Sequence, residues 1–335
     1  MAVRKMIGML SAAGSAATLL AYARYREEMR AVRDKVESGS TIAETSAGPV
    51  EYAEAGEGRP LLMIHGAGGG YDQGLLVARD FADGFRVIAP SRFGYLRTPV
   101  PPDPSPAAQA DAHAALLDFL GIAKCVVAGV SAGGPSAIEL ALRHPDKVSA
   151  LVLLVPRTYD PTQTIGADES VQSKAVRRLI QSSADFLFWI AIRVARPAVV
   201  RFFGSLPELD AKASPEDRQR VTEVIRSALP LSGRVRGIAV DSGIGLSPCP
   251  LERIKVPVLI VSARDDLWRT LPGARFTSEH IASAELRVLE SGGHLMIGQE
   301  KQVTGWIRRF LAAHGIERRV RGGKQQAAER VLAEA

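Results

Sequence analysis

The sequence predicts an α/β fold with a mostly parallel sheet and helices on both of its faces. Short, continuous apolar runs alternate along the chain with stretches of helical periodicity, which is typical of parallel strands buried on both faces. The 335 residues suffice for one large domain or for a core domain with an insertion. Hydrophobic residues make up 46% and charged residues 23% of the chain. This composition is that of a globular protein and excludes wholesale disorder.

Residues 1–40 are predicted to form a hydrophobic segment followed by a polar helix. The run 6–23 contains no charged residue, and basic residues stand on both sides of it. Its length only just meets the lower bound for a helix that crosses a bilayer. Three alternatives are open. A membrane anchor would be oriented by the basic residues after the run, with the rest of the chain in the cytoplasm. The other two are a cleaved signal peptide and a helix packed on a cytoplasmic domain.

The first part of the predicted core, residues 48–156, follows a linker at 38–48 that is rich in Gly, Ser and Thr. Its short apolar runs are bounded by glycine, proline or charged residues, as buried strands are. Helical patterns lie between these runs and stop at Gly121 and Pro145. The predicted strands are 61–64, 85–89, 125–130 and 151–155, and the predicted helices are 107–120 and 133–143.

The interval 157–250 interrupts this alternation, because it has several helical patterns but no clear buried strand. Ser214 is a suitable N-cap for one helix, with Pro215 at the first helical position. An aromatic-rich helix is predicted over 184–203. We interpret the interval as a helical lid inserted over the carboxyl edge of the sheet. The core resumes over 251–315 with strands at 258–262 and 285–289, and residues 316–335 form a polar tail.

The chain is basic, with a net charge of +6 and a pI of about 9.5. No helix-turn-helix spacing, zinc-finger pattern or aromatic-and-basic strand accompanies the arginines. The sequence therefore predicts a solvated basic surface and no nucleic-acid partner. The two cysteines exclude a disulfide framework and are too few for a structural zinc site, so no metal is predicted.

The pattern G-x-S-x-G at residues 129–133 marks Ser131 as a candidate nucleophile. It follows the strand 125–130 directly and opens the helix 133–143, which is the strand–turn–helix context of a nucleophile elbow. Small flanking residues allow the strained turn that presents the serine hydroxyl at the top of the sheet. Because a helix N-terminus stabilises negative charge, the amide of Ala132 is a candidate oxyanion donor.

A glycine-rich loop, His65-Gly66 followed by Ala67 and three glycines, comes after the strand at 61–64. Amides in such a loop can point inward, and one just after His-Gly can pair with the amide after the nucleophile in an oxyanion hole. Ala67 is the predicted donor, with Gly68 as its alternative. No Lys-Ser/Thr pair follows the glycines and the dinucleotide pattern is not met, so the loop predicts no nucleotide cofactor. His65 itself is expected to be structural.

His294 is the predicted general base. It lies in a glycine-rich loop after the last predicted strand, where its imidazole can reach over the edge of the sheet. Two other histidines, His113 and His144, are expected to face solvent or to cap a helix.

The base needs an orienting carboxylate. Asp266 follows the strand at 258–262 and is our first choice, with Asp265 second. Asp160, after the strand at 151–155, is a further alternative.

Together these stretches resemble the α/β-hydrolase family, in its branch with a helical lid. The likeness covers about residues 50–311 and rests on the His-Gly loop, the G-x-S-x-G elbow, the Asp pair and the final Gly-His, in the chain order Ser131, Asp266, His294. It implies an eight-stranded sheet, a Ser–His–Asp triad, hydrolysis through an acyl-enzyme and no cofactor. Residues 91–98 depart from the family's D-x-x-G-x-G-x-S, and Ala263 stands where glycine is common.

We therefore hypothesise a serine hydrolase that cleaves a carboxylic ester or related acyl bond in a small molecule. The aromatic and aliphatic residues of the predicted lid favour an apolar acyl or alkyl group. C–C bond hydrolysis and cofactor-free perhydrolysis use the same triad and are alternatives, whereas Ser131 excludes an aspartate nucleophile. An alternative from another class is a non-catalytic binding protein tethered to a membrane through residues 6–23.

Overall fold

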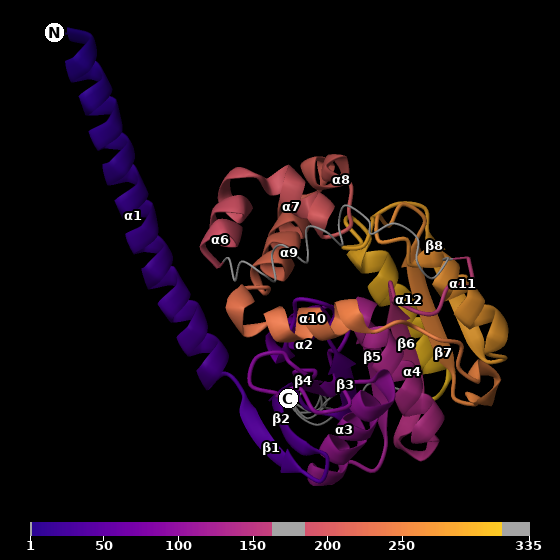
Figure 1. Ribbon diagram of the computed structural model, residues 1–335. Helices are drawn as coiled ribbons and strands as arrows, with labels where there is room; N and C mark the ends of the chain where they lie inside the picture. Colours follow the sequence, from indigo (N-terminus) through magenta and orange to yellow (C-terminus); the bar gives the residue numbers. More distant parts are fainter. Residues whose placement is uncertain (1, 163–184, 317–335) are drawn as a thin grey trace, which may run out of the picture.

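The computed structural model describes residues 2–162 and 185–316 (Figure 1). Within them, eight strands form one sheet in the order β1-β2-β4-β3-β5-β6-β7-β8. Neighbours from β4 to β8 pair in parallel, whereas β2 is antiparallel to both β1 and β4. The mostly parallel sheet is thus confirmed. The strands are β1 (Thr41–Thr45), β2 (Gly48–Ala55), β3 (Arg59–Ile64), β4 (Phe85–Pro90), β5 (Cys125–Val130), β6 (Val148–Leu154), β7 (Val258–Ala263) and β8 (Ala284–Leu289).

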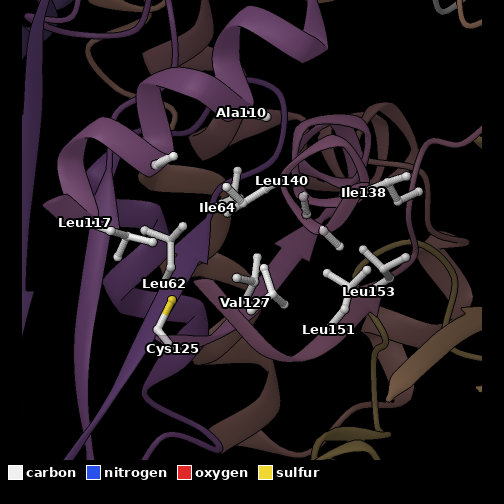
Figure 2. Packing of buried hydrophobic residues seen from close by; sticks show 14 of the residues in the cluster. Leu62, Ile64, Ala110, Leu117, Cys125, Val127, Ile138, Leu140, Leu151 and Leu153 are labelled. Atoms are coloured by element: carbon white, nitrogen blue, oxygen red, sulfur yellow. The ribbon is translucent and has the colours of Figure 1, made fainter. Parts of the chain in front are cut away.

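Helices cover both faces of the sheet, which explains why the central strands read as continuous apolar runs. In β3, Leu62 and Ile64 point into one core cluster, and Leu61 and Met63 point into the other. Figure 2 shows the first cluster, where β3, β5 and β6 meet α3 and α4. The helices of the core are α2 (Tyr71–Ala78), α3 (Pro106–Phe119), α4 (Gly134–Arg143), α11 (Leu271–His280) and α12 (Glu300–Ala313).

The predicted linker at 38–48 is wrong, because this segment contains β1 and the start of a tight hairpin to β2. Gly48 has a φ of 98°, a conformation that favours glycine. The Thr45 hydroxyl donates to the Gly48 carbonyl at 2.6 Å and accepts the Ala47 amide at 3.2 Å. The Gly and Thr residues that suggested a linker therefore form the turn of a hairpin.

Between β6 and β7 the chain forms the cover helices, α6–α10 (residues 185–243), which lie above the sheet in Figure 1. The N-cap of α9 is Ser214, as predicted, and its side chain accepts the Asp217 amide. The single helix predicted over 184–203 is wrong: Pro197 cannot continue the helix, so α6 and α7 are separate. Residues 163–184 of the predicted insertion and 317–335 of the predicted tail lie outside the described residues. The cover helices are α6 (Asp185–Val194), α7 (Arg196–Phe202), α8 (Pro207–Lys212), α9 (Pro215–Arg226) and α10 (Val235–Gly243).

The N-terminal segment is one helix, α1 (Ala2–Ser38), whose first half extends away from the body (Figure 1). Its second half packs on α6, with Met29 buried beside Trp189 in one apolar cluster. Among the residues whose side chains the structure describes, no helix has a stretch long and apolar enough to cross a membrane. Most of the candidate run 6–23 lies outside those residues, so its role as a membrane anchor stays a prediction.

Buried arginines fix α10 to the core at both of its ends. At the start, Arg234 donates to Asp72 of α2 at 2.7 Å and to the Gly69 carbonyl at 2.5 Å. Near the end, Arg92 donates two hydrogen bonds of 2.7 Å to Asp241. Both members of the second pair are buried. A buried ion pair needs such a bidentate geometry to offset the loss of hydration.

Removing one member of this pair is expected to destabilise the fold strongly, because it leaves the other charge buried without a partner. For Asp241→Ala we expect a loss of about 3–5 kcal/mol in the free energy of unfolding. The matched control is Glu290→Ala, which breaks an exposed bidentate pair with Arg264. This substitution should leave the free energy of unfolding nearly unchanged, because solvent screens the pair. Urea unfolding followed by circular dichroism measures both. Equal losses in the two variants would contradict a structural role for the buried pair.

Candidate active site

The turn after β5 holds Ser131 in a strained conformation. Its φ is 49°, in the left-handed region that residues other than glycine rarely adopt. The turn is tight on both sides of the serine: a Cβ at Gly129 would lie 2.9 Å from the Ala137 Cβ, and one at Gly133 would lie 2.6 Å from the Ile64 carbonyl oxygen. Only glycine fits at these two positions. The turn continues into α4 and holds the serine at the carboxyl end of the sheet, as expected of a nucleophile elbow.

Three predicted residues meet at this turn, although they come from distant parts of the chain. The Nε2 atom of His294 lies 2.9 Å from the Oγ of Ser131, and its Nδ1 lies 2.9 Å from an Oδ of Asp266. Burial raises the pKa of Asp266, but His294 and hydrogen bonds from His294, Thr270 and the Trp268 amide outweigh it and hold that pKa below its usual value. The carboxylate is therefore ionised at neutral pH and can orient the imidazole.

The neighbouring carboxylate, Asp265, has a different position. Its two oxygens accept the amides of Gly292 at 3.2 Å and Gly293 at 2.8 Å, directly before His294. Asp265 therefore shapes the loop that carries the imidazole, while Asp266 binds the imidazole itself. A second support of this loop, which no sequence pattern indicated, is the Gly204 carbonyl, which accepts the His294 amide at 3.0 Å. The only local signal at Gly204 is a glycine after a helical pattern.

The predicted oxyanion donors differ in what they bind. The amide of Gly68 donates to the Tyr95 hydroxyl at 3.3 Å. The amide of Ala67 has no acceptor in the part of the chain that the structure describes. Ala132 lies in the first turn after the elbow, where helical amides have no partner within the helix. Of the two alternatives in the loop, Ala67 is thus the one whose amide is available.

The loop that carries Ala67 is held from behind by His65. This side chain is buried, and its Nε2 accepts the Arg92 amide at 2.9 Å while its Nδ1 donates to the Gly66 carbonyl at 2.7 Å. Burial and the nearby Arg92 guanidinium lower the pKa of His65 well below its usual value. His65 is therefore neutral, and both of its ring nitrogens take part in hydrogen bonds that hold the loop.

The atypical segment 91–98 also supports this loop. Tyr95 accepts the Gly68 amide and donates to Asp241 at 2.5 Å. Glu51, fully buried in β2, accepts the Ser91 hydroxyl at 2.8 Å and the Arg97 guanidinium at 2.7 Å. A carboxylate from a neighbouring strand thus meets Ser91, the position at which the family pattern has aspartate.

The remaining candidates lie elsewhere. His113, expected at the surface or at a cap, is completely buried, and burial lowers its pKa to about 3. That expectation was wrong because α3 packs on the sheet at β1 and β2 and alongside α4, so this side of the helix is covered. His144 is the C-cap residue of α4 and contacts Asp111 at 2.8 Å. The carboxylate of Asp160 accepts the amide and hydroxyl of Thr162. Among the described residues, no group of His, Cys, Asp and Glu could hold a metal ion.

A cavity of about 100 Å³ opens beside Ser131 and His294. Its walls come from α2, α9, α12 and the loop after β8. Much of the lining is apolar, including Leu76, Val77, Phe81, Phe203, Val224 and Val303. A short apolar group attached to the atom that Ser131 attacks could therefore be buried here.

Comparisons with known proteins identify the fold family of this chain. A family model described as alpha/beta hydrolase fold matches residues 59–301. An uncharacterised hydrolase of Bacillus subtilis, YcgS, is 30% identical over 78% of this chain and 93% of its own length. A 2-hydroxymuconate semialdehyde hydrolase of a Pseudomonas species is 39% identical over 72% of this chain and 82% of its own.

Among solved structures, an alpha/beta hydrolase fold protein from Nakamurella multipartita is 31% identical. The match covers 82% of this chain and 99% of that one, with a TM-score of 0.66. The family match extends from β3 to the start of α12, so it includes the elbow, all three acidic candidates and the histidine loop. The chain therefore belongs to the alpha/beta hydrolase fold family and is a hydrolase.

Proposed function

We propose that this protein is a serine hydrolase that cleaves a carboxylic ester or related acyl bond through an acyl-enzyme. The observation that carries the proposal is the unbroken chain of hydrogen bonds from Ser131 through His294 to Asp266. A serine hydroxyl is a weak nucleophile unless a base within hydrogen-bond reach removes its proton. The 2.9 Å contact to His294 meets that requirement, and the ionised Asp266 selects the tautomer whose Nε2 is free to accept.

In the first half of the reaction, His294 takes the proton of Ser131 as its oxygen attacks the carbonyl carbon. The Ala67 and Ala132 amides stabilise the oxyanion that develops, a contribution of about 2.7–4 kcal/mol for a single donor in comparable enzymes. His294 then gives the proton to the leaving alkoxide, which departs and leaves the acyl-enzyme. In the second half, His294 activates a water molecule that releases the acid and restores the serine.

The cover helices act as a lid in this proposal. Phe203, at the end of α7, and Val224 of α9 line the cavity beside Ser131. The acyl group would therefore enter between the core and the cover helices. The apolar lining supports a substrate whose acyl group is short and mainly apolar.

Hydrolysis of a C–C bond is the second candidate. The compound in the name of the 39% identical relative, 2-hydroxymuconate semialdehyde, contains no ester or amide, so its hydrolysis must break a carbon–carbon bond. The same histidine and serine would serve that reaction. Turnover of p-nitrophenyl esters and of 2-hydroxymuconate semialdehyde, compared by kcat/KM on one preparation, distinguishes the two candidates.

Ser131→Ala tests the nucleophile. We expect a fluorophosphonate probe to label the wild-type protein once, at Ser131, and the variant not at all, because the alanine has no oxygen to phosphonylate. Ester hydrolysis should fall by about 10³- to 10⁶-fold. Mass spectrometry locates the adduct. An adduct that persists in the variant, or none on the wild type, would contradict the proposal.

Substitution of the two adjacent aspartates should lower kcat to different extents. Asp266→Asn is expected to lower kcat by about 10⁴-fold, because the amide favours the wrong tautomer of His294. Asp265→Asn only loosens the loop before the histidine, which should cost about 10- to 100-fold. Glu290→Gln, an exposed carboxylate nearby in the chain, is the control and should leave kcat unchanged. A larger loss of kcat in Asp265→Asn than in Asp266→Asn would instead indicate that Asp265 orients the histidine.

A further inference from the structure

The cavity at Ser131 also reaches charged side chains of three segments. Asp80 lies in the turn after α2, Arg220 in α9 and Glu300 at the start of α12, and all three line the same cavity as Ser131 and His294. The apolar walls thus lead from the reacting serine to a polar region. A substrate arm that fills the cavity would meet these charges.

The arginines around this region are already matched by other carboxylates. Arg79 donates to Glu223 at 2.8 Å, and Arg220 donates to Asp217 at 2.8 Å. Within the part of the chain that the structure describes, the carboxylate of Asp80 has one distant ionic contact, 3.9 Å, to the Nε of that same Arg79. Asp80 and Glu300 therefore leave this part of the cavity with an excess of negative charge.

Asp80 is kept in an unfavourable setting for a carboxylate. Its side chain is only 21% exposed. Burial and the nearby charges of Glu300 and Glu223 raise the pKa of Asp80 to about 6. The guanidinium groups of Arg220 and Arg79 oppose this shift without cancelling it. The other titratable groups that line the cavity are Arg220, Glu300 and His294. Above pH 6 the carboxylate is ionised without a full partner, and a cation in the cavity would supply one.

We propose that Asp80 is a specificity-determining residue that accepts hydrogen bonds from a protonated amine at the end of a short apolar arm of the substrate. The inference rests on the proposed function and names its substrate class: acyl compounds whose arm ends in an ammonium group. The cavity of about 100 Å³ is smaller than the roughly 150 Å³ that hold a benzene molecule elsewhere, so the arm is short.

Competitive inhibition by matched small molecules tests this. We expect n-butylamine to inhibit hydrolysis of p-nitrophenyl acetate at pH 7.5 with a Ki at least about ten-fold lower than that of 1-butanol. The reason is that charge attraction to a partly buried carboxylate is worth an order of magnitude in affinity. Butanoate should inhibit more weakly than both. Asp80→Asn should make amine and alcohol equal. Glu285→Gln, which removes an exposed carboxylate in β8, should leave the wild-type order intact.

Equal Ki values for amine and alcohol in the wild type, or an amine preference that survives Asp80→Asn, would overturn the inference. The same molecules are also tested as stabilisers in thermal unfolding of Ser131→Ala, which needs no turnover. An amine-specific rise in Tm that Asp80→Asn removes supports the inference even if no ester is hydrolysed. In that case only the proposed function fails.

A second, independent observation concerns the surface where α1 meets α6. Large apolar side chains are exposed here: Leu19 is 70%, Leu20 72% and Leu187 62% exposed to solvent. The second half of α1 is packed against α6, while the first half extends away from the body (Figure 1). We call Leu19, Leu20, Tyr22 and Leu187 the α1–α6 patch.

Beside the patch lies an excess of positive charge. The carboxylate of Glu28 is contacted by Arg24 at 3.0 Å, by Arg226 at 3.9 Å and by Arg193. Three guanidinium groups therefore share one carboxylate. Exposed apolar side chains flanked by unmatched cations are the combination that binds an anionic lipid surface, because the chains enter the acyl region while the cations meet the headgroups.

We infer that the α1–α6 patch docks on the surface of an anionic bilayer, with α1 lying in the interface. The test is sedimentation of the full chain with vesicles of phosphatidylcholine, alone or mixed equally with phosphatidylglycerol. We expect at least about ten-fold tighter binding to the anionic vesicles, with most of it lost in 0.5 M salt. Replacing both leucines, Leu19→Ser with Leu20→Ser, should abolish binding. Phe119→Ser, which removes an exposed aromatic residue of α3, is the control.

Equal binding to neutral and anionic vesicles would overturn this inference, as would binding that survives the double substitution. A second copy of the chain is the rival occupant of the patch. Sedimentation equilibrium without lipid would reveal it as a dimer that the same double substitution dissociates, and that result would likewise overturn lipid docking.

Discussion

The left-handed backbone of Ser131 is the constraint on which the site depends. A non-glycine residue in this region costs of order 1–3 kcal/mol, and it persists only where its surroundings leave no alternative. Here β5 is paired on both sides, by β3 and β6, and the close approach at Gly133 leaves no space for a relaxed turn. The Arg157 amide, just after β6, also donates to the Ser131 carbonyl at 2.9 Å. The hydroxyl is therefore presented to His294 by packing that extends through the sheet.

The central strands could be predicted from the sequence because both of their faces are buried. The continuous apolar runs of β3, β5, β6 and β7 were identified in this way. The strands β4 and β8 were identified as well, although each contains an arginine and β8 is a partly exposed edge strand. The hairpin of β1 and β2 could not be predicted, because it lies at the edge and its residues are mixed. Glu51 illustrates the reason: a charged residue in a short segment suggests solvent, yet it is fully buried and satisfied by Ser91 and Arg97, forty residues and more away. Only the folded chain shows these partners.

The residues of the candidate site also differ in how far the sequence could predict them. Ser131, Asp266 and His294 could be identified because each follows an apolar run, at the edge where the carboxyl ends of parallel strands meet. The choice between Asp265 and Asp266 needed the geometry, since adjacent residues in a turn point differently and both accept hydrogen bonds from the histidine loop. Arg92 and Asp241 are 149 residues apart, so no local pattern could join them. Helical periodicity placed His113 in a helix but could not show how deeply that helix is packed.

The arginines of this basic chain serve two physically different purposes. Those around α10 are internal: Arg234 binds Asp72 at its start, Arg92 binds Asp241, and Arg157 donates to the carbonyls of Asp241 and Ile244 at its end. Cations at a helix C-terminus are favourable because its last carbonyls are unpaired and negative. Carboxylates or carbonyls bind the guanidinium groups of these arginines. The arginines therefore hold the cover helices on the core and add little positive charge to the surface. Exposed arginines contribute positive charge at the surface instead, and those beside Glu28 border exposed leucines. The same residue type therefore stabilises the fold of the site in one place and makes a surface for association in another.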